Sequence, residues 1–254
     1  MARGDDIRRQ LAGGETLTAC WLTLCSPIAA EIVALAGFDA LVIDQEHGPG
    51  DPYNAILLMQ AAGSNVPCLM RVASADPNLI KRALDTGIDG LMVPMVESAD
   101  QARAVVAACR FPPEGTRGIA PGSVRAARYG YDRAGFVAAR GRDVFVICQV
   151  ETKATVGRIA EIAVVEGVDM LFIGRNDLAS SIGRVADPSH ADAKALLAEA
   201  EAGIKAAGKP LGGITAPGDD VRALHGRGYG LVIAGSDHTL LRDAAVAAVK
   251  AARG

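Results

Sequence analysis

The sequence predicts a single α/β domain, residues 1–254, folded as a closed (β/α)₈ barrel of the TIM type. Three observations support this prediction. Short apolar runs typical of strands alternate with alanine-rich stretches typical of helices along the whole chain. Eight such runs fall within 254 residues, which is the size of one closed barrel. An open doubly wound sheet is the competing fold, but no Gly-rich dinucleotide loop follows an early strand.

The eight expected strands are short, β-rich runs. Because strand–helix alternation implies right-handed crossovers, these strands should lie parallel to one another in one sheet. In chain order they are Thr18–Leu22, Ala40–Ile43, Cys68–Val72, Gly90–Val93, Val144–Val150, Met170–Ile173, Pro210–Gly213 and Leu231–Ile233.

The alanine-rich stretches between the strands are expected to form the helices that cover the barrel. No linker or change of composition divides the chain. The longest irregular stretch, 111–143, is rich in Pro, Gly and Arg, and we expect it to form a functional loop or a subunit contact. The expected helices span about 27–36, 52–62, 77–86, 98–109, 152–163, 189–207, 217–225 and 237–251.

Composition excludes several classes of protein. Half of the residues are hydrophobic and the net charge is −3, so nothing indicates nucleic acid or an anionic membrane as partner. The apolar runs are strand-sized, far below the roughly 18 residues of a membrane span. Residues 1–10 are charged and lack the apolar stretch of a signal peptide. The five cysteines are odd in number and form no CxxC pair, which indicates reduced thiols in a cytoplasmic protein, with Cys68 and Cys148 packed inside.

Unusual polar residues follow several of the expected strands. They are Asp44–Pro49 after the second strand, Arg71 at the end of the third, Gln149–Thr152 at the end of the fifth and Gly174–Leu178 after the sixth. In a (β/α)₈ barrel, chemistry takes place at the C-terminal ends of the strands. We therefore expect these residues, which are far apart in the sequence, to converge on one mouth.

The carboxylates Glu151 and Asp177 come from neighbouring strands. Two carboxylates that face one cavity repel each other unless a cation lies between them. Two carboxylates, completed by water and substrate oxygens, suit a hard divalent cation such as Mg²⁺ or Mn²⁺. The alternative is that each carboxylate only caps the helix that follows it.

His47 and Arg71 are the other two residues that the pattern singles out. His47 follows Asp44 and Glu46 at a strand end, where a nearby carboxylate would raise its basicity and fix its tautomer. The alternative is a solvated or packed histidine. Arg71 ends an apolar run and needs an anionic partner, which is either a structural carboxylate or a substrate oxyanion.

The motifs at these strand ends resemble those of the HpcH/HpaI aldolase family, the class II pyruvate aldolases that act on sugar acids and on 4-hydroxy-2-oxoheptanedioate. The resemblance runs from about Trp21 to Asp237, and its motifs are specific together rather than singly. The segments that carry it are Gly37–Asp39, Ile43–Pro49, Val93–Val96, Phe111–Gly118, Gln149–Thr152, Gly167–Asp169, Phe172–Gly174 and Asp177–Leu178.

The resemblance implies a role for each matching residue. His47 would be the proton acceptor and donor, and Arg71 would stabilise the enolate or the transition state. Glu151 and Asp177 would hold the divalent metal. That metal could be Mg²⁺, Mn²⁺ or Co²⁺, because oxygen ligands discriminate poorly among these ions.

The oxo acid would be bound by residues of the same strand ends. The resemblance implies that Gln149 contacts it, together with the backbone amides of Asn176 and Asp177 in the turn that begins at Gly174. A turn at a helix N-terminus binds carboxylates well, although it is also an ordinary helix cap. Trp21 is a candidate lining residue of the same pocket.

The resemblance also implies an aspartate that raises the basicity of the histidine, at the position of Asp85. The predicted topology puts Asp85 after the third expected helix, at the bottom of the barrel and far from His47. A neighbouring subunit would have to supply it, which fits the hexamers with exchanged C-terminal helices that the family implies. Asp44, three residues from His47, is the local candidate.

One motif departs from the family pattern. After the sixth strand the family has Gly-Pro-x-Asp-Leu-Ser, whereas this chain has Arg175 in place of the proline and Asn176 after it. The side chain of Arg175 either points to solvent or adds an anion contact beside the substrate. The identity of the acceptor aldehyde therefore does not follow from the resemblance.

Taken with the residues, the resemblance predicts metal-dependent aldol cleavage of a 4-hydroxy-2-oxo acid to pyruvate, or a close 2-oxo acid, and an aldehyde, or the reverse condensation. No lysine is expected to end a strand, so no Schiff base is proposed. The alternatives are a lyase of CoA thioesters, a decarboxylase of a 2-oxo diacid, and an inactive barrel that serves as a binding or scaffold protein. The expected partners are small molecules and further copies of the chain in a hexamer or trimer of dimers.

Overall fold

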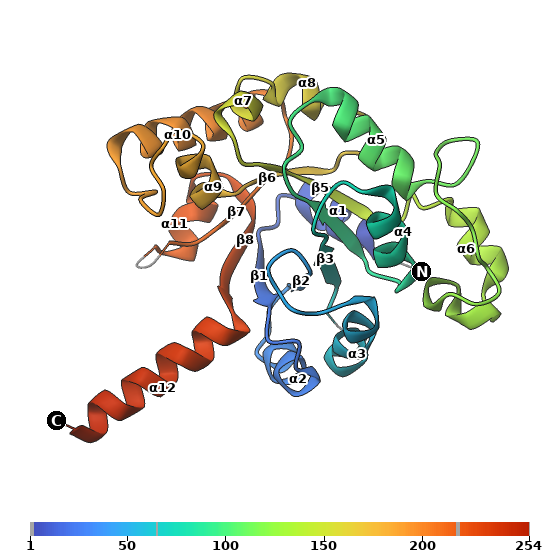
Figure 1. The fold of residues 1–254 in the computed structure, drawn as a ribbon, viewed down its shortest axis with the longest axis horizontal. Coiled ribbons are helices and arrows are strands. Elements are labelled where there is room, and N and C mark those ends of the chain that lie inside the picture. The colour runs from blue at the N-terminus through green and yellow to red at the C-terminus, as the bar shows by residue number, and fades with distance from the viewer. Residues whose placement is uncertain (1–2, 65, 217–218, 254) are drawn as a thin grey trace.

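The strands close into a barrel in which each strand pairs with its neighbours in sequence order (Figure 1). The computed structural model describes residues 3–64, 66–216 and 219–253. All pairings are parallel, and β8 closes the barrel against β1. The strands are β1 (Leu17–Leu22), β2 (Ala40–Asp44), β3 (Cys68–Arg71), β4 (Gly90–Val93), β5 (Phe145–Val150), β6 (Met170–Ile173), β7 (Leu211–Ile214) and β8 (Tyr229–Ser236). The predicted fold is confirmed.

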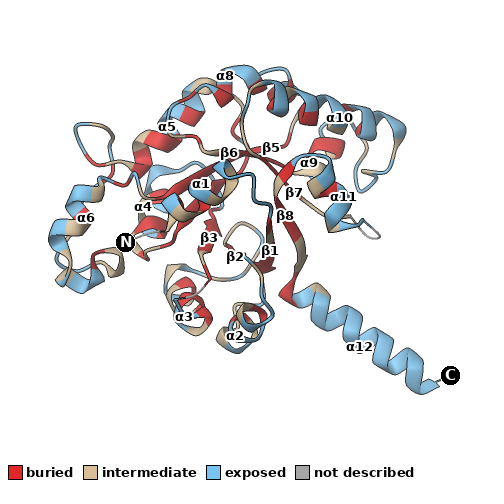
Figure 2. Cartoon of the chain, turned by 180° about the vertical axis from the view of Figure 1, so that it is seen from behind, coloured by how far each residue is buried: buried red, intermediate tan, exposed pale blue. Residues whose placement is uncertain are grey.

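Helices surround this barrel (Figures 1 and 2). Several begin at a local signal, since Ser26, Asp51 and Asp76 each cap a helix whose first residue is proline. The helices are α1 (Gly4–Ala12), α2 (Pro27–Leu35), α3 (Pro52–Ala62), α4 (Pro77–Asp85), α5 (Ala99–Cys109), the 3₁₀ helix η1 (Arg125–Gly130), α6 (Arg133–Ala139), α7 (Lys153–Val156), α8 (Ile159–Ala163), α9 (Arg175–Ser180), α10 (Ala191–Ala206), α11 (Val221–Gly226) and α12 (Asp237–Arg253).

Three expectations about the helices need correction. The stretch 152–163 is two short helices, α7 and α8, because the first ends at Gly157 and the second begins after Arg158. The stretch 111–143 is not wholly irregular, since it contains η1 and α6. The charged N-terminus forms α1, which the sequence did not predict. Of the helix expected at 217–225, the first two residues lie outside the described residues.

Side chains alternate between the two faces of every strand. Val42, Leu69, Ile147 and Phe172 fill the inside of the barrel. The residues between them in sequence pack outward against the helices in a second, larger cluster. Figure 2 shows the buried barrel inside the more exposed helices. The same alternation decides which residues at the strand ends face the mouth of the barrel. A residue two positions after an inward side chain also points inward.

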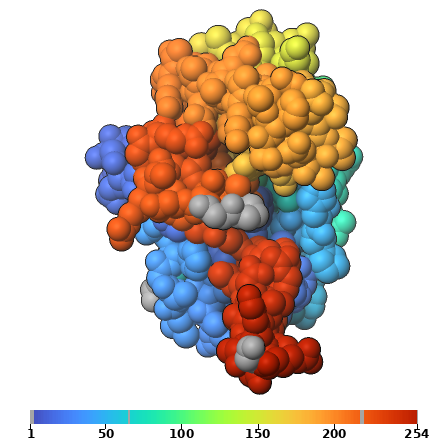
Figure 3. All heavy atoms as spheres, turned by 90° about the vertical axis from the view of Figure 1, so that its left-hand side faces the viewer, coloured from blue at the N-terminus to red at the C-terminus, as the bar shows by residue number. Residues whose placement is uncertain are grey.

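The last helix extends away from the body of the chain. Figures 1 and 3 show α12 as a projection next to α2. Its apolar residues Leu241 and Val246 are exposed, as are Ile28 and Ile32 of α2. Within the described ranges, no helix is both long enough and apolar enough to cross a membrane. The five cysteines are free thiols, and Cys68 and Cys148 are buried as expected.

Candidate active site

Five of the predicted site residues lie at inward positions at the C-terminal end of the barrel. Asp44 follows inward Val42 on β2, and Arg71 follows inward Leu69 on β3. The same alternation carries Gln149 on β5, Glu151 beyond it and Gly174 after β6 to the mouth. The fold therefore brings together residues that the sequence separates by more than a hundred positions.

Arg71 is held by two carboxylates and an aromatic ring. Its Nε and Nη2 donate to the two oxygens of Asp44 at 2.9 and 2.7 Å, which is the bidentate geometry that suits a guanidinium. Its Nη1 lies 2.8 Å from Oε2 of Glu46. The guanidinium carbon lies 4.4 Å from the ring centroid of Trp21. These contacts hold a permanent positive charge in one orientation at the mouth.

The Asp44 carboxylate serves Arg71 and the backbone rather than the imidazole of His47. Asp44 accepts hydrogen bonds from the backbone N–H groups of Glu46 and His47 as well as from the guanidinium. Arg71 and these donors lower the pKa of Asp44 against the opposing effect of its burial. The carboxylate oxygen near the His47 ring belongs to Glu46, whose Oε2 lies 3.9 Å from Nε2. The expected local pairing of Asp44 with the imidazole is thus not the arrangement in the chain.

Glu46 is a residue of the mouth to which the sequence reasoning gave no role of its own. It stands between Asp44 and His47 in the same motif, so the sequence alone shows that it lies near both. Local sequence gives no sign that its side chain turns toward Arg71, because that contact joins β2 to β3.

Glu151 is buried and held in a fixed position. Its Oε2 accepts from the backbone N–H of Met95 at 2.8 Å, and its Oε1 accepts from the Gln149 amide at 3.0 Å. A Cβ at Gly174 would lie 2.6 Å from Oε1, so only glycine leaves room for this carboxyl. Burial raises the pKa of Glu151 to about 7, and the charges of Glu46 and Asp177 add to the rise.

Asp177 approaches the same place from the first turn of α9. It is exposed, and its charge acts on both Glu151 and Glu46. Asn176 precedes it, also exposed. The first backbone N–H groups of a helix have no acceptor within the helix, so those of Asn176 and Asp177 are available to a ligand. On β5, the Oε1 of Gln149 is buried without a hydrogen-bond partner.

These residues fit a divalent cation that takes most of its ligands from water and substrate. Glu151 is an acidic group that burial and neighbouring carboxylates drive towards protonation, and a cation would relieve that repulsion. No group of three or more His, Cys, Asp or Glu residues in the described part of the chain could by itself hold a metal ion. Two carboxylates from Glu151 and Asp177 are nevertheless a donor set that suits Mg²⁺ and similar ions.

Arg175, the first residue of α9, is paired with a carboxylate of a neighbouring segment. Nη1 of Arg175 lies 2.9 Å from Asp219 in the segment after β7, and the side chain is only 17% exposed. Arg175 therefore does not point to bulk solvent but joins α9 to the segment before α11.

Asp85 lies at the other end of the barrel. It is the last residue of α4 and accepts a hydrogen bond at 2.8 Å from Arg117, whose buried guanidinium packs on Phe111 and Phe136. Within the chain, Asp85 makes no contact with His47 among the described residues. This agrees with the predicted topology.

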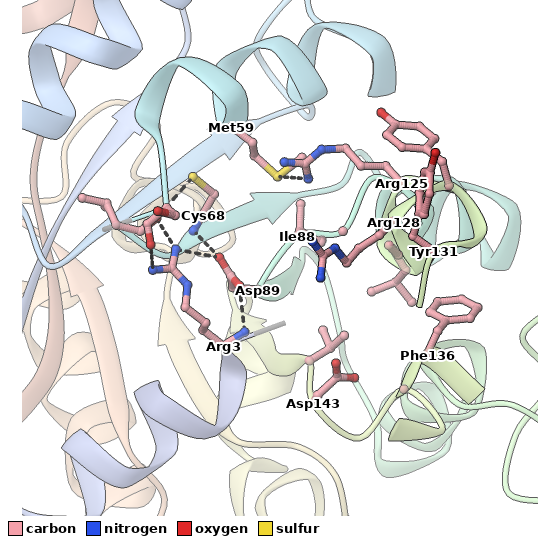
Figure 4. A pocket seen from close by; sticks show the side chains of 18 of the residues that line it. Arg3, Met59, Cys68, Ile88, Asp89, Arg125, Arg128, Tyr131, Phe136 and Asp143 are labelled. Atoms are coloured by element: carbon pink, nitrogen blue, oxygen red, sulfur yellow. Dashed lines mark hydrogen bonds and ion pairs between the residues drawn. The ribbon is translucent and has the colours of Figure 1, made fainter. Parts of the chain in front are cut away.

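A cavity of about 660 Å³ opens near Asp85, at the N-terminal ends of β3 to β5. Figure 4 shows Arg125, Arg128 and Tyr131 on one side of it, with Arg3 and Asp89 on the other. The cavity is therefore separate from the mouth that holds Arg71 and Glu151.

The whole chain was compared with protein families, with curated proteins and with solved structures. A family model described as HpcH/HpaI aldolase/citrate lyase matches residues 17–244. The chain is 38% identical to a hydroxypyruvate/pyruvate aldolase of Chromohalobacter salexigens over 95% of both chains. It is 39% identical to a 4-hydroxy-2-oxovalerate aldolase of Rhodococcus jostii, over 93% of this chain and 92% of the other. A crystal structure of an HpcH/HpaI aldolase/citrate lyase family protein from Burkholderia cenocepacia superposes with a TM-score of 0.93 at 36% identity, covering 98% of this chain and 99% of that one.

Proposed function

The chain belongs to the HpcH/HpaI aldolase/citrate lyase family, and on that premise we propose that it is a metal-dependent carbon–carbon lyase. Its substrate is a 4-hydroxy-2-oxo acid, which it cleaves to pyruvate, or a close 2-oxo acid, and an aldehyde. The observation that carries the proposal is the convergence of Glu151 and Asp177 beside the clamped guanidinium of Arg71. The reverse reaction is the aldol condensation of the same two products.

Glu151 and Asp177 would hold the divalent cation. When bound, it supplies Lewis-acid polarisation of the 2-oxo group and stabilises the negative charge of the enolate. Gln149 has a buried Oε1 without a partner, and a group of the oxo acid or a water molecule would satisfy it. The free N–H groups of Asn176 and Asp177 suit the carboxylate of the oxo acid.

His47 and Arg71 would carry out the proton and charge steps. In cleavage, the imidazole of His47 takes the proton from the C4 hydroxyl while the C3–C4 bond breaks, and the electron pair of that bond goes to the enolate. The same imidazole, 69% exposed at the mouth, can return a proton to C3. Arg71 offsets the charge on the oxygen atoms, because Asp44 and Glu46 fix its orientation.

We also propose that the functional form is a homo-oligomer, a hexamer or trimer of dimers. The exposed apolar residues of α12 and α2 support an assembly in which α12 packs on another copy. In that assembly, Asp85 would reach the His47 of a neighbouring subunit.

The proposal is tested by mixing pyruvate with a panel of aldehydes and reading the products by mass. We expect condensation with Mg²⁺, Mn²⁺ or Co²⁺, and loss of activity after chelation with EDTA. His47→Ala and Glu151→Ala should each abolish cleavage, and sodium borohydride with pyruvate should not trap the protein. Full activity after exhaustive chelation would contradict the role of the metal.

A further inference from the structure

The carboxylate of Glu46 lies between the two groups that act on the substrate. A single oxygen, Oε2, is 2.8 Å from Nη1 of Arg71 and 3.9 Å from Nε2 of His47. The first distance is that of a close ion pair, although the two groups are not aligned as a hydrogen bond and Oε2 is buried without a hydrogen-bond partner. The second is longer than a hydrogen bond but within ion-pair range.

Within one described chain, neither Asp44 nor Asp85 takes this position. Both oxygens of Asp44 are taken by the guanidinium of Arg71 and by backbone N–H groups. Asp85 is bound to Arg117 at the opposite end of the barrel. The side chain of His47 is 69% exposed and therefore needs a partner to limit its rotation.

The charges around Glu46 come from several elements. Burial raises its pKa, Arg71 from β3 and His47 from its own loop lower it, and Asp44 from β2 and Asp177 from α9 raise it. Arg71 and His47, the two groups that lower the pKa of Glu46, are therefore the groups whose spacing its carboxylate would fix.

We propose that Glu46 is a positioning residue that holds the imidazole of His47 and the guanidinium of Arg71 at a fixed spacing across the mouth. Asp44 holds the Nε edge of Arg71, and Glu46 holds Nη1 and thereby links it to the imidazole. The reaction needs both groups in place around one substrate, so an imidazole that moves out of position would lower the rate without weakening the binding of the oxo acid. This inference rests on the proposed aldolase function.

The test compares Glu46→Gln with Glu114→Gln, since Glu114 also forms ion pairs, with Arg140 and Arg142, but lies away from the mouth. We expect Glu46→Gln to lower kcat about 10-fold or more while KM for pyruvate stays within about twofold. The pH profile of kcat should change in this variant alone. Glu46→Asp, which keeps the charge, should recover part of the rate.

A second measurement does not depend on activity. The ring cross-peak of His47 in a ¹H–¹³C NMR spectrum, assigned by its absence in His47→Asn, should move in Glu46→Gln and not in Glu114→Gln. An unmoved cross-peak, or a kcat and pH profile equal to those of the wild type, would overturn the inference. A wild-type protein that is inactive with every aldehyde would instead refute the proposed function, and the NMR result would still decide the role of Glu46.

Discussion

Glu151 shows how a single buried carboxyl couples stability to pH. The pKa of this group rises from 4.5 to about 7, mainly because of burial. Between these two values the folded protein retains a proton that the unfolded chain releases. Stability from this group is therefore lost as the pH rises, and the loss is complete above pH 7. The full cost is about 3 kcal/mol, since each pKa unit corresponds to about 1.4 kcal/mol.

Glu151→Gln should remove that cost in the metal-free protein. In the presence of EDTA, we expect the variant to be more stable than the wild type by up to about 3 kcal/mol at pH 8, and by less than about 1 kcal/mol at pH 5. Urea unfolding at the two pH values measures the difference, and other titrating groups cancel because both proteins share them. A difference that is the same at pH 5 and pH 8 would show that the carboxyl is not the cause.

Gly174 leaves space for Glu151, so Gly174→Ala should displace that carboxyl. The new Cβ would lie 2.6 Å from Oε1 and 2.7 Å from Cγ, and the backbone N–H of Met95 restrains the side chain from swinging away. We expect the affinity for Mn²⁺, measured by calorimetry, to fall about 10-fold or more.

Gly226→Ala is the matched control for this change, because a Cβ there meets no atom within 4 Å. It should bind Mn²⁺ as the wild type does. Equal affinity in both glycine variants would mean that Glu151 does not hold the metal.

At the scale of elements, Asp237 fixes the start of α12 to the segment that follows β1. Its buried carboxylate accepts from the backbone N–H groups of Thr23 and Leu24 at 2.9 and 3.0 Å. Asp237→Ala would leave these donors without a partner, and we expect a loss of about 1–3 kcal/mol in urea unfolding. Asp243→Ala, an exposed position on the same helix, should change stability by less than about 0.5 kcal/mol. Equal losses in the two variants would argue against an anchoring role.

Elements with a local signal could be predicted from the sequence. The strands are continuous apolar runs because they are buried on both faces, and α3 begins with Asp51 and Pro52 as cap and first residue. The helix α1 has no such signal. It is held instead by distant contacts, with Ile7 buried under the barrel and Arg8 paired with Asp169.

The same distinction applies to the site. Their positions at the C-terminal ends of the expected strands predicted that Asp44, Arg71 and Glu151 would share the mouth, and the fold agrees. Which carboxylate binds which cation depends on packing between strands. The pairing of Arg71 with both Asp44 and Glu46 could therefore not be read from the motif alone.

At the scale of the whole molecule, Asp85 and His47 lie at opposite ends of one barrel, so they can act together only between copies. Mixing His47→Asn with Asp85→Asn should then restore activity, because an assembly of the two inactive variants contains some sites with both native residues. Random mixing would restore about a quarter of the sites. Activity per site after co-refolding measures this.

The control mixes His47→Asn with Glu151→Gln. Both residues belong to the same mouth, so no site in that mixture is complete and activity should stay absent. If the first mixture also stays inactive, Asp85 does not act on a neighbouring subunit.

The stacking of Trp21 on Arg71 has a practical consequence for the study of this protein. Trp21 is the single tryptophan of the chain, and its ring lies 4.4 Å from the guanidinium carbon of Arg71. Its ultraviolet emission therefore reports on the mouth of the barrel alone. Without any added dye, a fluorescence titration can follow the arrival of an oxo acid or a metal ion.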